Sequence, residues 1–201
     1  MPRATCPNCQ RPLATCYCSA LVKLSNNIKV LIIQHPLEAT HPFNTGRMAK
    51  LCLSNSELII AETLSNTDLK NMLGIPSALL YPSLSWLPAT PEIGDSVNED
   101  AITPAIQQLI VIDASWRKSK KMLHLHPALQ NLPRVNLSGG LASQYQIRKT
   151  SISNGLSTIE SIAQAMQQLE HHAEFKQMLM PFEKMIALQQ ASYQKTQKKP
   201  T

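Results

Sequence analysis

The sequence has few aromatic residues and no long apolar run. Only 4% of its 201 residues are Phe, Trp or Tyr, so a core must be built from Leu, Ile, Val, Ala and Met. No segment approaches the ~18 consecutive apolar residues that a membrane-spanning helix needs. The first twenty residues carry four cysteines and lack the apolar stretch of a signal peptide. We therefore expect a cytoplasmic protein with no membrane partner.

Composition limits the architecture and suggests a class of partner. With 43% hydrophobic residues, the chain can bury one sizeable core and carry a small appendage. Its formal net charge is +6, with a pI near 9.1. This moderate excess of bases favours a polyanionic partner without proving one.

Four cysteines near the start form two close pairs, Cys6-Pro-Asn-Cys9 and Cys16-Tyr-Cys18. Two pairs brought together by a short reversal supply four thiolates in a tetrahedron, which is the geometry of structural zinc. Two disulfides and unliganded thiols are the alternatives, although disulfides are rare inside cells. We predict a closed, non-catalytic zinc knuckle over residues 1–24.

Other residues near these cysteines have two readings. Arg3, Arg11 and an exposed Tyr17 are candidates to touch a nucleic acid, but the knuckle is as well explained as a brace for the neighbouring domain. The fifth cysteine, Cys52, lies between two leucines on an expected helix. We expect it to be a packed core thiol.

After the knuckle, apolar strands alternate with helical patterns, which predicts an α/β fold with a mostly parallel sheet flanked by helices. The expected strands are 28–34, 58–61, 78–81, 109–113 and 134–137. The expected helices begin near residues 44, 67, 115, 157 and 174.

Two segments fall outside this alternation. Residues 82–104 contain four prolines and four acidic residues, so we expect a long acidic loop that acts as a lid or a variable excursion. Residues 191–201, rich in Lys and Gln, are expected to form a flexible basic tail. The catalytic domain is therefore expected to span residues 25–190.

Asp113 follows the apolar run 109–112 directly. Such a run, closed by a carboxylate, predicts a buried strand that delivers an acid to the carboxyl edge of the sheet, where open α/β folds bind ligands. The cations of 117–121 follow at once and suggest an anionic substrate, as in an enzyme that acts on RNA. The alternatives are that Asp113 caps the next helix and that the cations form a solvated helix face.

Two further polar segments complete the pattern. His35-Pro-Leu-Glu38 is followed by Asn44-Thr45-Gly46-Arg47, and residues 145–149 (YQIRK) lead to residues 156–160 (LSTIE). In the second segment Ser157 and Glu160 form a capping box, which by itself explains much of their presence.

With these motifs in this order, from Cys6 to about Ala163, the chain resembles the DTW-domain family of tRNA-uridine aminocarboxypropyltransferases, which are related to the SPOUT-like knotted RNA-modifying enzymes. Ser115 stands where the D-x-T-W signature has Thr, so the hydroxyl is kept and a methyl is lost. The resemblance implies a SPOUT-like fold with a C-terminal knot. It also implies transfer of the 3-amino-3-carboxypropyl group of S-adenosylmethionine to N3 of a tRNA uridine, with release of methylthioadenosine.

With this reaction as the working hypothesis, we assign roles to residues. Asp113 is expected to accept the N3 proton, because partial desolvation raises the proton affinity of a strand-end carboxylate. The donor is assigned to Ser115, Trp116, Leu132, Pro133, Ser157, Thr158 and Glu160. RNA is assigned to Arg47, Arg117, Lys120, Lys121, Arg148 and Lys149. Pocket residues without an assigned role are His35, Glu38, Asn44 and Thr45, and the zinc ligands are Cys6, Cys9, Cys16 and Cys18.

Some assignments have open alternatives. Arg148 also suits the carboxylate of the donor, and Trp116 also suits the core. At the level of the whole protein, a SPOUT-type RNA methyltransferase differs only in which carbon is presented to the RNA. Two alternatives belong to other functional classes. One is a zinc-containing RNA-binding module without catalytic activity, and the other is a protein-interaction adaptor.

Overall fold

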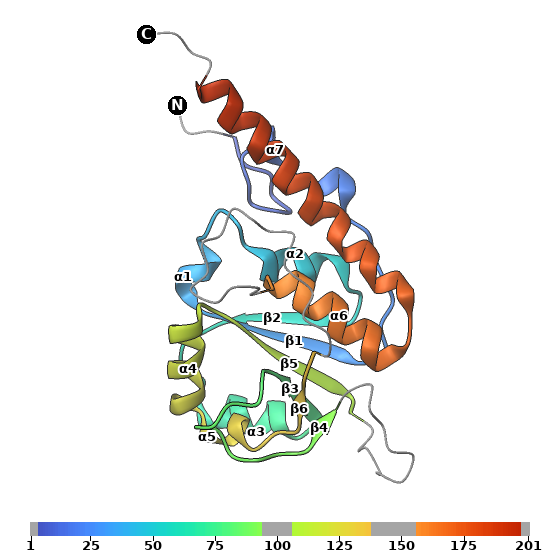
Figure 1. The fold of residues 1–201 in the computed structure, drawn as a ribbon. Coiled ribbons are helices and arrows are strands. Elements are labelled where there is room, and N and C mark those ends of the chain that lie inside the picture. Colours follow the sequence, from blue (N-terminus) through green and yellow to red (C-terminus); the bar gives the residue numbers. More distant parts are fainter. Residues whose placement is uncertain (1–3, 94–105, 138–155, 198–201) are drawn as a thin grey trace.

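The strands assemble into a single parallel sheet. The computed structural model describes residues 4–93, 106–137 and 156–197 (Figure 1). Within them the strand order is β2-β1-β5-β3-β6-β4, and every neighbouring pair is parallel. The strands are β1 (Lys29–Gln34), β2 (Ser56–Ile60), β3 (Ser77–Leu80), β4 (Glu92–Ile93), β5 (Gln108–Asp113) and β6 (Arg134–Val135).

Helices connect the strands and cover both faces of the sheet. The α-helices are α1 (Pro36–Ala39), α2 (Thr45–Cys52), α3 (Asn66–Leu73), α4 (Trp116–Leu125), α5 (Pro127–Gln130), α6 (Thr158–Glu170) and α7 (Met180–Gln197). Three 3-10 turns are η1 (Leu13–Thr15), η2 (Cys18–Ala20) and η3 (Ala173–Leu179). None of the described helices is long and apolar enough to cross a membrane.

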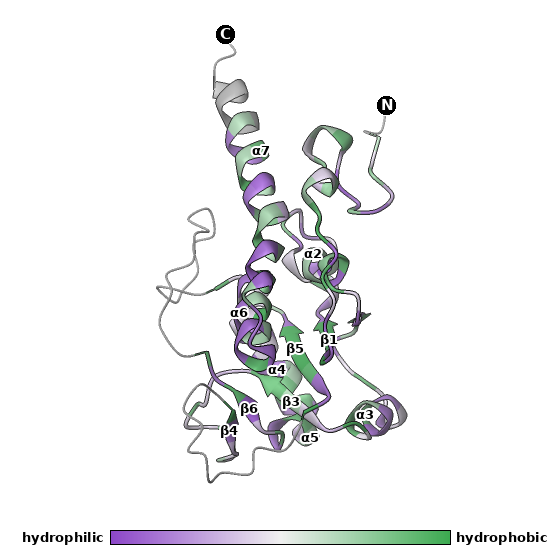
Figure 2. Ribbon diagram, turned by 90° about the vertical axis from the view of Figure 1, so that its right-hand side faces the viewer, coloured by the Kyte–Doolittle hydropathy of each residue, from purple (hydrophilic) through white to green (hydrophobic). Residues whose placement is uncertain are grey.

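The centre of the sheet is apolar on both sides, as expected for parallel strands covered by helices. Side chains of β1 and β5 alternate between two cores, and Figure 2 shows these strands and β3 largely in the hydrophobic colour. Ile32 and Val111 pack on the side of α2 and α6, whereas Leu31 and Ile110 pack on the side of α3, α4 and α5. Aliphatic residues and Met dominate both cores, as the low aromatic content predicts.

The N-terminal cysteine segment packs beside α7, far along the sequence (Figure 1). Phe182 and Met185 of α7 belong to the same core as Cys6 and Tyr17. The ammonium of Lys184 donates to the hydroxyl of Ser19. The knuckle is therefore part of the main body through its contacts with the last helix.

The predicted alternation of strands and helices is confirmed, but the short helices α1 and α5 were not expected and three further elements differ. Strand β4 lies inside the segment expected to be a loop, because the amide of Arg134 donates to the carbonyl of Pro91 (2.8 Å) and pairs this short stretch with β6. The last helix is preceded by the separate 3-10 turn η3. Helix α7 continues to Gln197, into the segment expected as a tail, because no Pro or Gly interrupts residues 182–199.

The expected C-terminal knot, on which the SPOUT-like relationship depends, involves the connection between β6 and α6. Residues 138–155 of that connection lie outside the described residues.

Candidate active site and cysteine cluster

Asp113 lies at the carboxyl end of β5, where three elements meet. Its side chain is buried, with 6% of the residue exposed. Carboxylate Oδ2 accepts a hydrogen bond from Nε2 of Gln34 (2.6 Å), and Oδ1 accepts one from the hydroxyl of Thr158 (2.5 Å). The N-cap residue of α4 is Ser115, so Asp113 is not the cap of that helix. Both carboxylate oxygens of Asp113 are therefore held by hydrogen-bond donors from neighbouring elements.

Gln34 links this carboxylate to α2. Gln34 and Asp113 are register partners on parallel strands, so both side chains reach the same edge. Nε2 of Gln34 also donates to Oδ1 of Asn44 (2.7 Å), and that oxygen accepts from the amide of Arg47 (2.8 Å) and caps α2. Gln34 was not among the site residues predicted from the sequence. The sequence feature that could have indicated Gln34 is a polar amide side chain at the end of an otherwise apolar strand.

Gly46, in the first turn of α2, lies against the carboxylate. A Cβ at this position would lie 2.3 Å from Oδ2 of Asp113 and 3.0 Å from Nε2 of Gln34. Only a residue without a side chain leaves room for this approach. Thr45, the residue before it, is buried.

The N-terminus of α6 positions Thr158. The amide and hydroxyl of Ser157 both donate to Oε2 of Glu160 (2.7 and 2.6 Å), which forms the predicted capping box. Ser157 and Glu160 are buried and therefore fix the first turn of the helix. Of the three residues assigned to the donor here, Thr158 reaches Asp113.

Helix α4 starts three residues after Asp113 and presents cations to solvent. Arg117, Lys120 and Lys121 are exposed. Neither Arg117 nor Lys120 makes an ion pair with a described residue. The ammonium of Lys121, in contrast, lies 2.8 Å from Glu62, and this contact, with a smaller contribution from His35, holds the pKa of the Glu62 carboxyl below its usual range.

Trp116, the first residue of α4, is 37% exposed, and its ring meets the ring of Tyr81 edge-on at 5.7 Å. Ser115, which precedes it, is also exposed. Both residues therefore border the carboxyl edge of the sheet next to Asp113.

Glu38 links α1 directly to α4, and His35, the N-cap of α1, is linked to α4 through Glu62. Nδ1 of His35 accepts from the amide of Leu37 (3.1 Å), and its Nε2 lies 3.5 Å from Glu62. The carboxylate of Glu38 lies 3.4 Å from the ammonium of Lys118. These contacts hold α1 at the same edge as Asp113.

The remaining assigned residues are more dispersed. Leu132 and Pro133 are partly buried, and the carbonyl of Pro133 accepts from the amide of Leu79 on β3 (2.8 Å). Arg47 is partly buried on α2. Arg148 and Lys149 lie outside the described residues.

The four predicted cysteine ligands converge. Their Sγ atoms all lie within 4.8 Å of one another, and all four thiols are free, so no two of these cysteines form a disulfide. Backbone amides of Cys9 and Asn8 lower the pKa of Cys6 to about 6, whereas burial and neighbouring thiols raise the pKa of Cys18 to about 12. A cation would remove the penalty of ionising thiols this close, so the cluster fits a metal ion.

Arg11 and Tyr17 do not form an exposed nucleic-acid surface. Tyr17 is 2% exposed, and its burial raises the pKa of its phenol. Arg11 is buried too. Its Nη1 donates to the carbonyl of Pro42 (3.1 Å), and its guanidinium lies 5.8 Å from the centre of the Phe43 ring. The knuckle thus braces the turn that leads into α2; Arg3 lies outside the described residues.

Cys52 is fully buried in the core, as predicted. Burial raises the pKa of its thiol to about 11. This thiol is therefore a packing residue.

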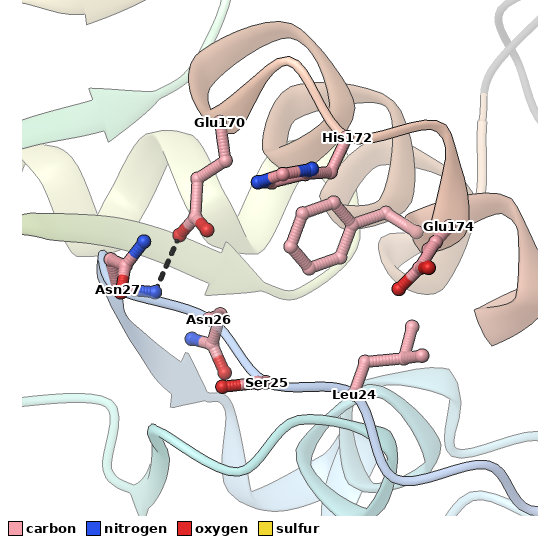
Figure 3. A pocket seen from close by; sticks show the side chains of 8 residues that line it. Leu24, Ser25, Asn26, Asn27, Glu170, His172 and Glu174 are labelled. Atoms are coloured by element: carbon pink, nitrogen blue, oxygen red, sulfur yellow. Dashed lines mark hydrogen bonds between the residues drawn. The ribbon is translucent and has the colours of Figure 1, made fainter.

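A pocket of about 230 Å³ lies at the opposite edge of the sheet, before β1 (Figure 3). One wall comes from residues 24–27 and the other from residues around the end of α6. Glu170 joins the two walls, because its Oε1 accepts from the amides of Asn27 (2.9 Å) and Ile28 (2.8 Å). These contacts anchor α6 to the start of β1, away from Asp113.

Comparisons with known proteins agree on one family. A family model described as "DTW domain" matches residues 3–190. tRNA-uridine aminocarboxypropyltransferase 2 of Drosophila melanogaster is 30% identical over 187 residues, which cover 89% of this chain and 71% of that protein. tRNA-uridine aminocarboxypropyltransferase A of Arabidopsis thaliana is 27% identical over 197 residues, covering 86% and 75%. The Macaca fascicularis tRNA-uridine aminocarboxypropyltransferase 2 is 25% identical over 196 residues, covering 93% and 64%. No solved structure matches the chain significantly.

Proposed function

The chain belongs to the DTW-domain family, and we propose that it transfers the 3-amino-3-carboxypropyl group of S-adenosylmethionine to N3 of a uridine in tRNA. The names of its relatives support this activity. The position of Asp113 is the observation that carries it. A buried carboxylate ends the central strand of a parallel sheet, directly before a cationic helix.

Asp113 acts as the general base. The N3–H of uracil is weakly acidic, and nitrogen becomes a good nucleophile once the proton moves to the carboxylate. N3 then bonds to the terminal carbon of the transferred group as the bond from that carbon to sulfur breaks. The electron pair stays on sulfur, and neutral methylthioadenosine leaves. Because opposite charges disappear in this step, a buried site favours it over bulk water.

Gln34, Thr158 and Gly46 serve this base by fixing its position. The first two donate to different carboxylate oxygens, so the side chain is restrained at both ends. Gly46 lets the backbone of α2 approach on a third side. Such restraint keeps the reacting groups in a productive geometry.

The donor binds at the same edge of the sheet, where open α/β folds bind ligands. Ser115, Trp116, Leu132 and Pro133 contact it in this proposal. Ser157 and Glu160 act through the first turn of α6, which directs Thr158 toward Asp113.

The tRNA lies along α4. Arg117 and Lys120 contact phosphates, and Arg47 and Lys121 contribute at the margins, since Lys121 already pairs with Glu62. Phosphate contacts at a distance from N3 are favourable, because a cation touching N3 would stabilise the nucleophile and slow the attack.

The metal in the cysteine cluster is zinc. Four thiolates in a tetrahedron fill the coordination shell of zinc and leave no open position for catalysis. The ion therefore stabilises the knuckle and its contact with the turn before α2.

Donor labelled separately in its methyl and carboxyl carbons tests the reaction, with unmodified tRNA as acceptor. The carboxyl label is expected in uridine, and the methyl label in free methylthioadenosine. Methyl label in tRNA would identify a methyltransferase instead. Binding of tRNA without incorporation of either label would identify a non-catalytic module.

A further inference from the structure

Both tryptophans of this aromatic-poor chain lie at α4. Trp116 begins the helix, next to Asp113. Trp86, from the segment between β3 and β4, lies against the end of the helix, where its ring stacks on His124 with ring centres 4.9 Å apart and planes inclined by 17°. The ammonium of Lys120 lies 5.0 Å from the centre of the Trp86 ring. In Figure 1, α4 stands beside α1 at the carboxyl ends of β1 and β5.

Core packing accounts for Trp86 but not for His124. Trp86 is partly buried and packs against the core on the α3, α4 and α5 side. His124 is exposed although one face of its ring lies on Trp86. Its Nδ1 also lies 2.7 Å from the carbonyl of Lys120, which fixes the plane of the ring. The result is a flat, oriented aromatic surface with a cation beside it.

We propose that Trp86, Lys120 and His124 form a stacking platform for an unpaired base of the RNA substrate. Single-stranded RNA is commonly recognised by stacking bases on aromatic rings within a positive surface. Bases inside a duplex are already stacked and cannot use such a surface. The biological role of the platform rests on the proposed function. It adds to that function a preference for RNA that is unpaired near the target uridine.

The platform is separate from the reacting atoms. Trp116 and His124 are eight positions apart on one helix, which corresponds to about 12 Å along its axis. A base on the platform therefore belongs to a different nucleotide from the one presented to Asp113. Arg117, exposed between them, lies where the connecting backbone would pass.

Tryptophan fluorescence tests the platform directly. The substitution Trp116→Phe leaves Trp86 as the one tryptophan, so its emission reports on the platform alone. A short oligouridylate is expected to quench this emission, and an RNA duplex of equal length much less. Unchanged emission at saturating oligouridylate would overturn the proposal.

Affinity for labelled oligouridylate provides the second measurement. His124→Ala is expected to weaken binding about 5- to 100-fold, and His124→Phe to restore it, since one stacked base has this effect on binding. The slope of the logarithm of affinity against the logarithm of salt concentration should stay the same in both His124 variants. Lys120→Ala should lower this slope by about 1, because it removes one phosphate contact. His172→Ala, at the opposite edge of the sheet, is the matched control.

The outcomes separate this proposal from the reaction. Equal affinity of wild type and His124→Ala would refute the platform even if transfer activity is found. Quenching and loss of affinity in a protein that transfers no label would support the platform and refute the proposed reaction.

Discussion

Gly46→Ala places a methyl group directly against the proposed base. The new Cβ would lie 2.3 Å from Oδ2 and 2.9 Å from Cγ of Asp113, whereas ordinary contact begins at 3.4 Å. The carboxylate and α2 must therefore separate by about 1 Å. The shift also strains the hydrogen bond from Gln34, whose Nε2 would lie 3.0 Å from the methyl.

Stability and activity should respond differently to this change. Replacing Gly by Ala inside a helix gains about 1 kcal/mol, and overpacking costs about 1–3 kcal/mol, so the free energy of unfolding should fall by no more than about 2 kcal/mol. A displacement of about 1 Å in a catalytic group can lower a rate about 100-fold. We therefore expect a folded protein with a large loss of activity.

The assay is the single-turnover rate of uridine modification, with thermal unfolding measured in parallel. Gly74→Ala, at the end of α3, is the control, because a Cβ there meets its nearest atoms at 3.4 and 3.5 Å. A Gly46→Ala protein that modifies tRNA at the wild-type rate would refute the reasoning that Asp113 must keep this position.

Three further predictions concern the surroundings of this site. Gln34→Leu removes the donor to Oδ2 of Asp113 and one of the two donors to Oδ1 of Asn44. We expect the free energy of unfolding in urea to fall by about 1–3 kcal/mol and the transfer step to slow; unchanged values would contradict the network. Arg117→Ala should lower the slope of the logarithm of tRNA affinity against the logarithm of salt concentration by about 1. Lys121→Ala should lower this slope less, because the ammonium of Lys121 already pairs with Glu62. Chelation of the metal should lower the unfolding temperature and increase amide hydrogen exchange at residues 42–47. Arg11→Met should cause the same increase in exchange while the metal stays bound, because it removes the hydrogen bond to the carbonyl of Pro42. Amide protection at 42–47 that neither change lowers would show that the knuckle does not brace α2.

Sequence patterns predicted the features that depend on local composition. The strands β1 and β5 are apolar because helices cover both faces, so a short apolar run identified each of them. Asp113 was identified because it closes such a run, and the cysteine spacing predicted a cluster that the structure confirms.

The features that sequence patterns missed depend on contacts between distant segments. Gln34 matters through its register with Asp113, 79 positions later, and an amide has no catalytic chemistry of its own to draw attention to it. Tyr17 was expected at the surface, but it packs in the core that includes α7. Strand β4 has only two residues and exists through its pairing with β6.

The substitution Asp113→Asn tests the central claim most directly, since it keeps the shape of the side chain and removes its capacity to take the N3 proton. The single-turnover rate of 3-amino-3-carboxypropyl transfer should fall about 100- to 10,000-fold, with the affinity for tRNA unchanged. Transfer at the wild-type rate by this variant would contradict the account.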